Sequence, residues 1–433
     1  MPARFSSITA PMRFTSSSLR SLALLMGLSL ALLLTVWYAL PSQFLADEVL
    51  HASQILLLLN EQYRVIHSLE MPFGYHASVA LFAHIADVRS VSGFRLISTL
   101  LCLPLIALAW QYYRSVAPSY PFIQALQILC APLLWPFYWL LYTDVFTLNF
   151  VTLGLLGLTS QTFWLSAITG SAALLIRQHT VCWVALFWLM GLSQRDFFQH
   201  ARALLNFQNA SRSALIQMRN KLRNILIQTS PLAIPLIVFI GFALANSGIS
   251  MSSSGLQKYA LYPTQFYFLL LVLWWVLLPL HLANLFAIIG MLRRWWWAWL
   301  IVISVLIALY LLSFEISHPY NFRSDYFLRN WLLHFLNDRL RYRILAFIPM
   351  VWTLLSLSVT LLRRPENYWL YPISLAAILP LWLLEQRYFM APFFLWLLFR
   401  KPASRPFELT LLAWFAANSA LLTLAIMSTQ YFL

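Results

Sequence analysis

The chain has 433 residues, of which 61% are hydrophobic and 9% are charged, and its mean hydropathy is +0.74. This composition is too apolar for a water-soluble protein of this length, and it predicts an all-α protein that crosses a membrane many times. The net charge of +15 does not indicate nucleic-acid binding, because the basic residues are spread between apolar segments. Cys102, Cys130 and Cys182 lie in apolar segments without metal-ligand spacing and are odd in number, so neither a disulfide framework nor a zinc site is indicated. No cofactor is expected.

The amino-terminal segment is basic and rich in serine. We expect residues 1–20 to be a cytoplasmic tail and residues 21–433 to form one multispanning domain, whose first span lies at about 21–40. A cleaved signal peptide is the competing interpretation. No small-residue cleavage site stands out before Pro41, so an uncleaved first span is favoured.

Apolar segments then alternate with polar connections, which gives about 12–13 spans. Those after the first are expected at about 94–113, 121–140, 145–158, 163–176, 180–192, 230–246, 263–291, 295–313, 344–362, 368–384, 389–399 and 407–432. Several are shorter than the roughly 20 residues of a straight span, so some are expected to be broken or re-entrant. Two loops stand out: a polar one at 41–91, with short interfacial helices such as one at about 75–85, and a basic one at 193–228.

The positive-inside rule orients the chain. If the amino terminus is cytoplasmic, the basic loop at 193–228 and the pairs Arg293-Arg294, Arg363-Arg364 and Arg400-Lys401 share the cytoplasmic side, and most acidic residues lie on the other side. The basic loop is expected to contact anionic lipids. Ionisable groups near membrane depth are costly, so the polar clusters at the non-cytoplasmic span ends are expected to form one lumenal or exoplasmic site.

The first polar cluster follows the first span. If 47–54 is helical, Asp47 and Glu48 lie four and three residues before His51, and Gln54 lies three after it, so all four side chains share a face. The remaining clusters are Tyr142-Thr143-Asp144, Arg177-Gln178-His179, His318-Pro319-Tyr320 and Glu385-Gln386-Arg387-Tyr388-Phe389.

In this order the motifs resemble those of the dolichyl-phosphate-glucose-dependent alpha-1,2-glucosyltransferases, which add the terminal glucose to the dolichol-linked oligosaccharide. The likeness runs from about residue 40 to about 400 and also includes Pro72-Phe73-Gly74-Tyr75, Thr264-Gln265-Phe266-Tyr267-Phe268 and Met390-Ala391-Pro392. The chain departs from the family at 250–258, and again where Asp325 and Leu328-Arg329-Asn330-Trp331 stand in place of an Asp-Asn-Arg-His-Tyr block. It is therefore identified as a divergent member, with the differences concentrated where an acceptor would bind.

The resemblance implies an inverting hexosyltransferase that moves glucose from dolichyl- or polyprenyl-phosphate-glucose to a lipid-linked oligosaccharide, with an alpha-1,2 linkage, in N-glycan precursor assembly. Inversion in one displacement needs a base for the acceptor hydroxyl and a cation for the departing phosphate. Asp47 is the first choice for the base and Glu48 the second, with His51 holding the carboxylate in place. The substrate and donor-phosphate residues are expected to be Gln54, Asp144, Arg177, Gln178, His318, Arg387 and Tyr388.

Simpler interpretations stay open for each cluster. The acidic segment after the first span can be a solvated helix, Asp144 a helix cap or the ion-pair partner of Arg177, and Arg387 the partner of Glu385. Another polyprenyl-phosphate-sugar enzyme with a different sugar or an envelope-glycan acceptor is the alternative function, and a transporter or flippase is a third. The expected partners are the lipid donor, the lipid-linked acceptor and membrane lipid. The expected location is the endoplasmic reticulum membrane of a eukaryote or the plasma membrane of a bacterium.

Overall fold

The computed structural model describes residues 15–66, 69, 71–116, 119–205, 212–246, 248, 260–323 and 326–432. Over these ranges the chain forms α-helices and short 3₁₀ helices, two isolated β-bridges and no strand, which confirms the all-α fold class. Most of the expected amino-terminal tail, the divergent segment 250–258 and Asp325 lie outside the described residues.

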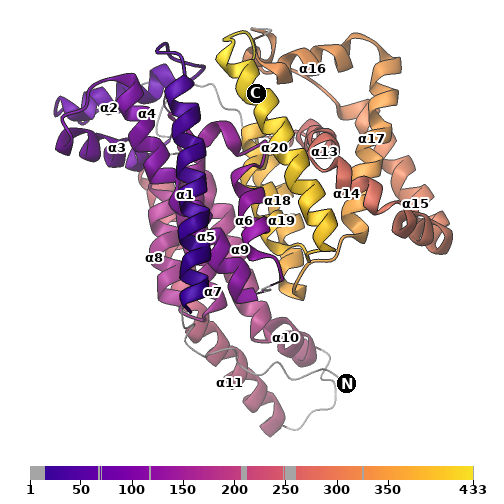
Figure 1. Ribbon diagram of the computed structural model, residues 1–433. Coiled ribbons are helices and arrows are strands. Elements are labelled where there is room, and N and C mark those ends of the chain that lie inside the picture. The colour runs from indigo at the N-terminus through magenta and orange to yellow at the C-terminus, as the bar shows by residue number, and fades with distance from the viewer. Residues whose placement is uncertain are drawn as a thin grey trace.

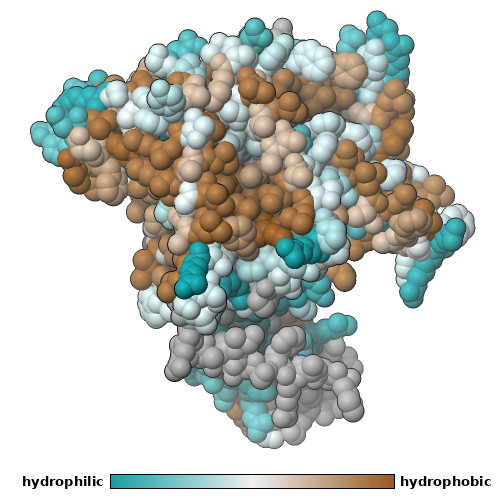
Figure 2. Space-filling model, viewed as in Figure 1, coloured by the Kyte–Doolittle hydropathy of each residue, from teal (hydrophilic) through white to brown (hydrophobic). Residues whose placement is uncertain are grey.

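In the described parts of the chain, six stretches of helix are long and apolar enough to cross a membrane. They are α1 (Ser16–Ala39), α4 with α5 (Val91–Cys102 and Pro104–Val116), α12 (Ile234–Ala245) with the preceding α11 (Arg212–Thr229), α15 (Leu285–Ser313), α17 (Leu340–Val359) and α20 (Arg405–Met427). In the stretch of α11 and α12, the apolar part is α12, whereas α11 is basic. Hydrophobic residues cover much of the surface around them (Figure 2). A polar exterior is what a water-soluble protein would show, so the chain is a multi-pass membrane protein.

The other apolar segments form shorter helices in the described parts of the chain. They are α6 (Pro121–Leu129), α7 (Asp144–Thr159), α8 (Phe163–Leu174), α9 (Val181–Gln194), α13 (Thr264–Val276), α14 (Leu278–Ala283), α18 (Leu370–Ile378) and α19 (Met390–Phe399). A straight span needs about 20 residues, so none of them crosses alone. Helices α7 and α19 are almost entirely buried and form the centre of the molecule.

The two loops of the sequence form helices at opposite ends of the molecule (Figure 1). The polar loop contains α2 (Glu48–Leu59) and α3 (Gly74–Ile85), and the basic loop contains α10 (Phe197–Leu205) and α11. Helix α16 (Leu328–Asp338) lies at the same end as α2 and α3, whereas α10 and α11 project from the other end.

A buried ion pair ties three helices together away from the polar loop. Arg400 donates from Nη1 to Glu408 Oε1 at 2.8 Å and from Nη2 to Gln127 Oε1 at 2.8 Å. Gln127 belongs to α6, Arg400 follows α19 and Glu408 lies in the first turn of α20. Because a buried charge is costly without its partner, this network fixes how the three helices pack.

Candidate active site

Asp47 lies at the start of α2, where the chain turns out of the first span. The residue before it, Ala46, has a φ of 51°, in the left-handed region that non-glycine residues rarely occupy. The backbone N–H of Asp47 donates to the Tyr142 hydroxyl at 3.1 Å, and its Oδ2 accepts from Arg387 Nη2 at 2.9 Å. Its side chain remains 43% exposed, so the carboxylate is held and still open to a substrate.

Arg387 is oriented by two carboxylates and a ring. Its Nε and Nη2 donate to the two oxygens of Glu385 at 2.6 and 2.9 Å, and its guanidinium lies 5.0 Å from the centre of the Tyr142 ring. Burial alone lowers the pKa of Arg387, but Glu385 and Asp47 outweigh that effect and raise it. Arg387 therefore stays a fixed cation beside Asp47.

Glu385 also contacts a second arginine. Arg329, in the first turn of α16, places Nη1 3.4 Å from Glu385 Oε1, and both side chains are buried. Burial alone raises the pKa of Glu385, but Arg387 and Arg329 outweigh it and lower the pKa. Glu385 is thus a buried anion that links α16 to the arginine beside Asp47.

A second ion pair joins α7 to the segment before α9. Arg177 donates from Nη1 to Oδ1 of Asp144, the first residue of α7. The other oxygen, Asp144 Oδ2, is buried and has no hydrogen-bond partner among the described residues. Burial, with a smaller effect of Arg387, lowers the pKa of Arg177 to about 10, so its guanidinium is charged at neutral pH.

A narrow cavity of about 60 Å³ connects the two ion pairs. Its polar lining consists of Asp144, Thr147, Arg177, His179, Thr180, Arg387 and Tyr388, and its apolar lining of Leu148, Val151, Trp183, Ala377, Leu381, Met390 and Ala391. Asp144, Leu148 and Val151 share one face of α7, so the wall changes from charged to apolar over about 10 Å of helix. Burial lowers the pKa of His179 to about 4, which keeps this imidazole neutral.

Glu48 lies next to Asp47 but points into the protein. It is 0% exposed, and its oxygens accept from Arg95 Nε at 2.9 Å, from Arg95 Nη2 at 2.5 Å and from the backbone N–H groups of Leu45 and Leu141. These four bonds occupy both oxygens. Glu48 therefore anchors the start of α2 to α4 and to the segment before α7.

His51 and Gln54 also face inward. His51 Nδ1 lies 2.9 Å from Nε2 of His76 in α3, so Arg387, and not His51, holds the Asp47 side chain. Gln54 donates to the Arg64 carbonyl and accepts from the Ile66 N–H, both at 2.9 Å, and so closes the segment that follows α2.

Of the remaining expected residues, His318 directly precedes one 3₁₀ helix and Gln178 begins another. His318 Nδ1 accepts from the Tyr320 N–H at 3.1 Å, and its ring packs edge-on against Trp382 at 4.6 Å between centres. Gln178 is buried beside Arg177. The structure thus brings together Asp47, Asp144, Arg177, Arg387 and Tyr388, while Glu48, His51 and Gln54 are held by other contacts.

Several partners were not expected from the sequence. His76 pairs with His51, Arg95 pairs with Glu48, and Arg329 joins Glu385. Arg95 carried a usable signal, because a charged residue within an apolar helix requires a partner. The sequence positions of His76 and Arg329 gave no indication of their partners. Among the described residues, no three His, Cys, Asp or Glu side chains are grouped as metal ligands would be.

Comparison with known proteins places this chain in a family. The model of the DIE2/ALG10 family matches residues 41–398. The chain is 24% identical over 316 residues to the Dol-P-Glc:Glc(2)Man(9)GlcNAc(2)-PP-Dol alpha-1,2-glucosyltransferase of Kluyveromyces lactis, and this match covers 65% of the chain but 58% of that protein. No solved structure matches the chain. Because the family match spans most of its length, the chain belongs to the DIE2/ALG10 family.

Proposed function

We propose that this protein is an inverting glucosyltransferase that moves glucose from dolichyl- or polyprenyl-phosphate-glucose to a lipid-linked oligosaccharide through an alpha-1,2 linkage. The observation that carries the proposal is that Arg387 joins the half-exposed Asp47 carboxylate to a cavity that Arg177 also lines. The family match and the name of the yeast relative support this donor and this acceptor.

The cavity lining fits a lipid-phosphate donor. Guanidinium groups match phosphate oxygens, so Arg177 and Arg387 would bind the phosphate. The isoprenoid chain would follow the apolar wall of Leu148, Val151 and Trp183. The unpartnered Asp144 Oδ2 would accept a hydrogen bond from a glucose hydroxyl. Because the cavity is narrow, the surrounding helices must separate when the lipid enters.

The charges of the site balance through the transfer. The three carboxylates of Asp47, Asp144 and Glu385 face three guanidiniums. The acceptor oxygen attacks C1 of glucose, the bond from C1 to the phosphate oxygen breaks with its electron pair on the phosphate, and the acceptor proton moves to Asp47. The phosphate gains one negative charge as Asp47 loses one. Once protonated, Asp47 releases Arg387 Nη2, which then stabilises the departing phosphate.

The location follows from the same arrangement. The site lies at the end of the molecule that carries α2, α3 and α16, away from the basic helices α10 and α11 (Figure 1). With the basic end in the cytoplasm, the site faces the lumen of the endoplasmic reticulum in a eukaryote, or the exterior of a bacterial plasma membrane.

The proposal is tested by the transfer of labelled glucose from dolichyl-phosphate-glucose to a diglucosylated lipid-linked oligosaccharide. Purified Asp47→Asn is compared with the wild type and with Asp87→Asn, an exposed acid of the same loop. We expect transfer by the wild type and by Asp87→Asn, and a loss of about 10²- to 10⁴-fold for Asp47→Asn, the usual range for a lost general base.

Other results would change the proposed substrate or base, or would contradict the proposed function. Donor binding or slow donor hydrolysis without transfer would keep the enzyme class and favour another sugar or an envelope-glycan acceptor. Wild-type activity in a folded Asp47→Asn protein would remove Asp47 as the base. If the wild type does not interact with the donor, the glucosyltransferase proposal is wrong.

A further inference from the structure

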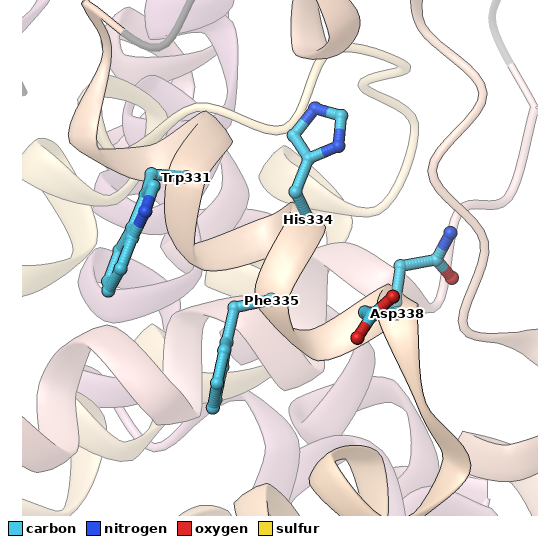
Figure 3. A pocket seen from close by; sticks show the side chains of 5 residues that line it. Trp331, His334, Phe335 and Asp338 are labelled. Atoms are coloured by element: carbon cyan, nitrogen blue, oxygen red, sulfur yellow. The ribbon is translucent and has the colours of Figure 1, made fainter.

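Helix α16 carries a surface hollow of about 430 Å³ that the site described above does not use. It is lined by Trp331, His334, Phe335, Asn337 and Asp338. In Figure 3 the rings of Trp331 and Phe335 project side by side from the helix, while His334 points the other way. The ring centres of Trp331 and Phe335 are 6.2 Å apart, and the angle between the two ring planes is 14°.

The aromatic stack continues into the next helix. Phe335 stacks on Tyr342 of α17, with the ring centres 4.4 Å apart. Asp338 lies on the same side of α16 as Trp331, because the two residues are seven positions apart in the helix. Trp331 is 62% exposed and Phe335 45%. The opposite side of α16 is buried through Arg329, Leu333 and Leu336, so packing fixes the helix while the stack stays open.

The polar groups beside the stacked rings help to decide whether the rings contact membrane lipid or a sugar chain. Exposed aromatic rings near a membrane can serve as interfacial anchors. The Asp338 side chain, however, is 64% exposed, and its contact with Arg339 is loose at 3.4 Å, so this carboxylate disfavours burial in lipid. The Asn337 amide and the His334 imidazole also line the hollow, although the His334 ring points away from the stack. Stacked rings beside an exposed carboxylate suit a sugar chain, whose C–H faces pack on rings and whose hydroxyls need polar partners.

The same helix reaches the candidate active site. Arg329, in its first turn, contacts Glu385, which orients Arg387 beside Asp47. From Arg329 to Asp338 the helix rises about 13 Å at 1.5 Å per residue. Arg329 lies on the buried side of α16 and the stacked rings on its open side, so a chain of sugar rings that starts at Asp47 would pass around the helix to reach them.

We propose that the face of α16 formed by Trp331, Phe335 and Asp338, with Tyr342, binds the oligosaccharide part of the acceptor at sugars distant from the one that receives glucose. The position of this glycan-binding face relative to Asp47 rests on the proposed function, whereas its binding of a glycan can be measured without any transfer.

The test measures binding of the free, water-soluble diglucosylated oligomannose glycan to full-length protein in lipid nanodiscs, by saturation-transfer NMR without donor. The Trp331→Ala, Phe335→Ala double variant is expected to bind at least about tenfold more weakly, because two ring contacts are lost. A Trp331→Tyr, Phe335→Tyr variant keeps the rings and should bind within about threefold of the wild type. Trp164→Ala in α8 is the matched control, since Trp164 is also 62% exposed.

Each outcome decides the proposal. If the double alanine variant binds the glycan with wild-type affinity, the proposed glycan-binding face is wrong. If that variant in addition unfolds more readily in lipid, the rings are membrane anchors. A wild type that binds no glycan would overturn the proposal too. Ring-dependent glycan binding by a protein that never processes the donor would keep the glycan-binding face and end the glucosyltransferase proposal. The tyrosine variant shows whether the loss comes from the rings or from misfolding.

Discussion

Two adjacent carboxylates, Asp47 and Glu48, have opposite surroundings. Asp47 precedes the first turn of α2 and is half-exposed, with one side-chain bond to Arg387, whereas Glu48 begins the helix and is enclosed by four bonds. A one-residue step along a helix rotates a side chain by about 100°, which is enough to turn Asp47 toward Arg387 and Glu48 into the core. Of the two carboxylates, only that of Asp47 is open to solvent.

The difference predicts a specific effect for Glu48→Gln. Removal of the Glu48 charge leaves Arg95, which is 1% exposed, as a buried unpaired cation, so the protein should lose about 3–5 kcal/mol of unfolding free energy. Thermal unfolding of detergent-purified protein measures this loss. Asp47→Asn is the matched variant and should change stability by about 1 kcal/mol or less, because its ion pair is partly exposed. A Glu48→Gln protein that is as stable as the wild type but inactive would point to a catalytic role instead.

The buried pair of His51 and His76 predicts a pH-dependent stability. Burial lowers the pKa of His76 to about 3, and burial together with His76 lowers that of His51 well below its ordinary value. The folded protein therefore keeps both rings neutral, while the unfolded chain takes up protons below about pH 6.5. The two neutral rings contribute fully to the unfolding free energy above about pH 6.5, and their contribution is lost as the pH falls toward 3. For His76 alone, the loss of unfolding free energy at pH 5 is about 2 kcal/mol.

The measurement is the melting temperature at pH 8 and at pH 5. His76→Gln, which keeps a hydrogen-bonding side chain for His51, should show a smaller drop than the wild type. An equal drop in both proteins would assign the acid sensitivity to other groups.

At the scale of the elements, α3 is docked onto the end of α8 at a glycine. The Gly74 N–H donates to the Leu175 carbonyl at 3.0 Å, and a Cβ at Gly74 would lie 2.5 Å from that oxygen. Leu175 is two residues before Arg177. The first polar loop and the arginine of the candidate phosphate site are therefore held together by this contact.

Gly74→Ala should lower glucose transfer more than tenfold and destabilise the protein by about 1–3 kcal/mol, because the methyl group forces the two segments apart. Transfer assays and thermal unfolding measure the two effects. Gly27→Ala in α1 is the control, since a Cβ there meets nothing within 4 Å, and it should leave both quantities near wild type. Full transfer by Gly74→Ala would show that the position of Arg177 does not depend on this contact.

The elements also show how far the sequence could be interpreted. Apolar run length identified α1, α17 and α20, and the ion pairs of Asp144 with Arg177 and of Glu385 with Arg387 were expected as the alternatives to a ligand role. Which of two adjacent acids is exposed, and the contacts of His51 with His76 and of Arg329 with Glu385, depend on how distant helices pack. Local spacing carries no information on such contacts. The same holds for the breaks that divide expected spans into pairs such as α4 and α5.

At the scale of the whole molecule, the helices of the polar loop and those of the basic loop lie at opposite ends. The candidate active site and α16 lie with α2 and α3, and the basic helices α10 and α11 lie opposite (Figure 1). Between them, the surface in Figure 2 is largely hydrophobic. Under the proposed function, the lipid donor would enter the site sideways from the bilayer, while its sugar and the acceptor would remain on the aqueous side.

This arrangement predicts the accessibility of single cysteines in sealed vesicles. In a variant that lacks Cys102, Cys130 and Cys182, cysteines placed at the exposed positions Gln62 and Asp338 should react with a membrane-impermeant maleimide only after the lumenal side is opened by detergent. A cysteine at Lys221 in α11, which is also exposed, should react in intact vesicles, because the orientation expected from the positive-inside rule puts this helix in the cytoplasm. Reaction of both Asp338→Cys and Lys221→Cys in intact vesicles would place α16 away from the lumen, and would exclude both the orientation of the site and the glycan-binding face.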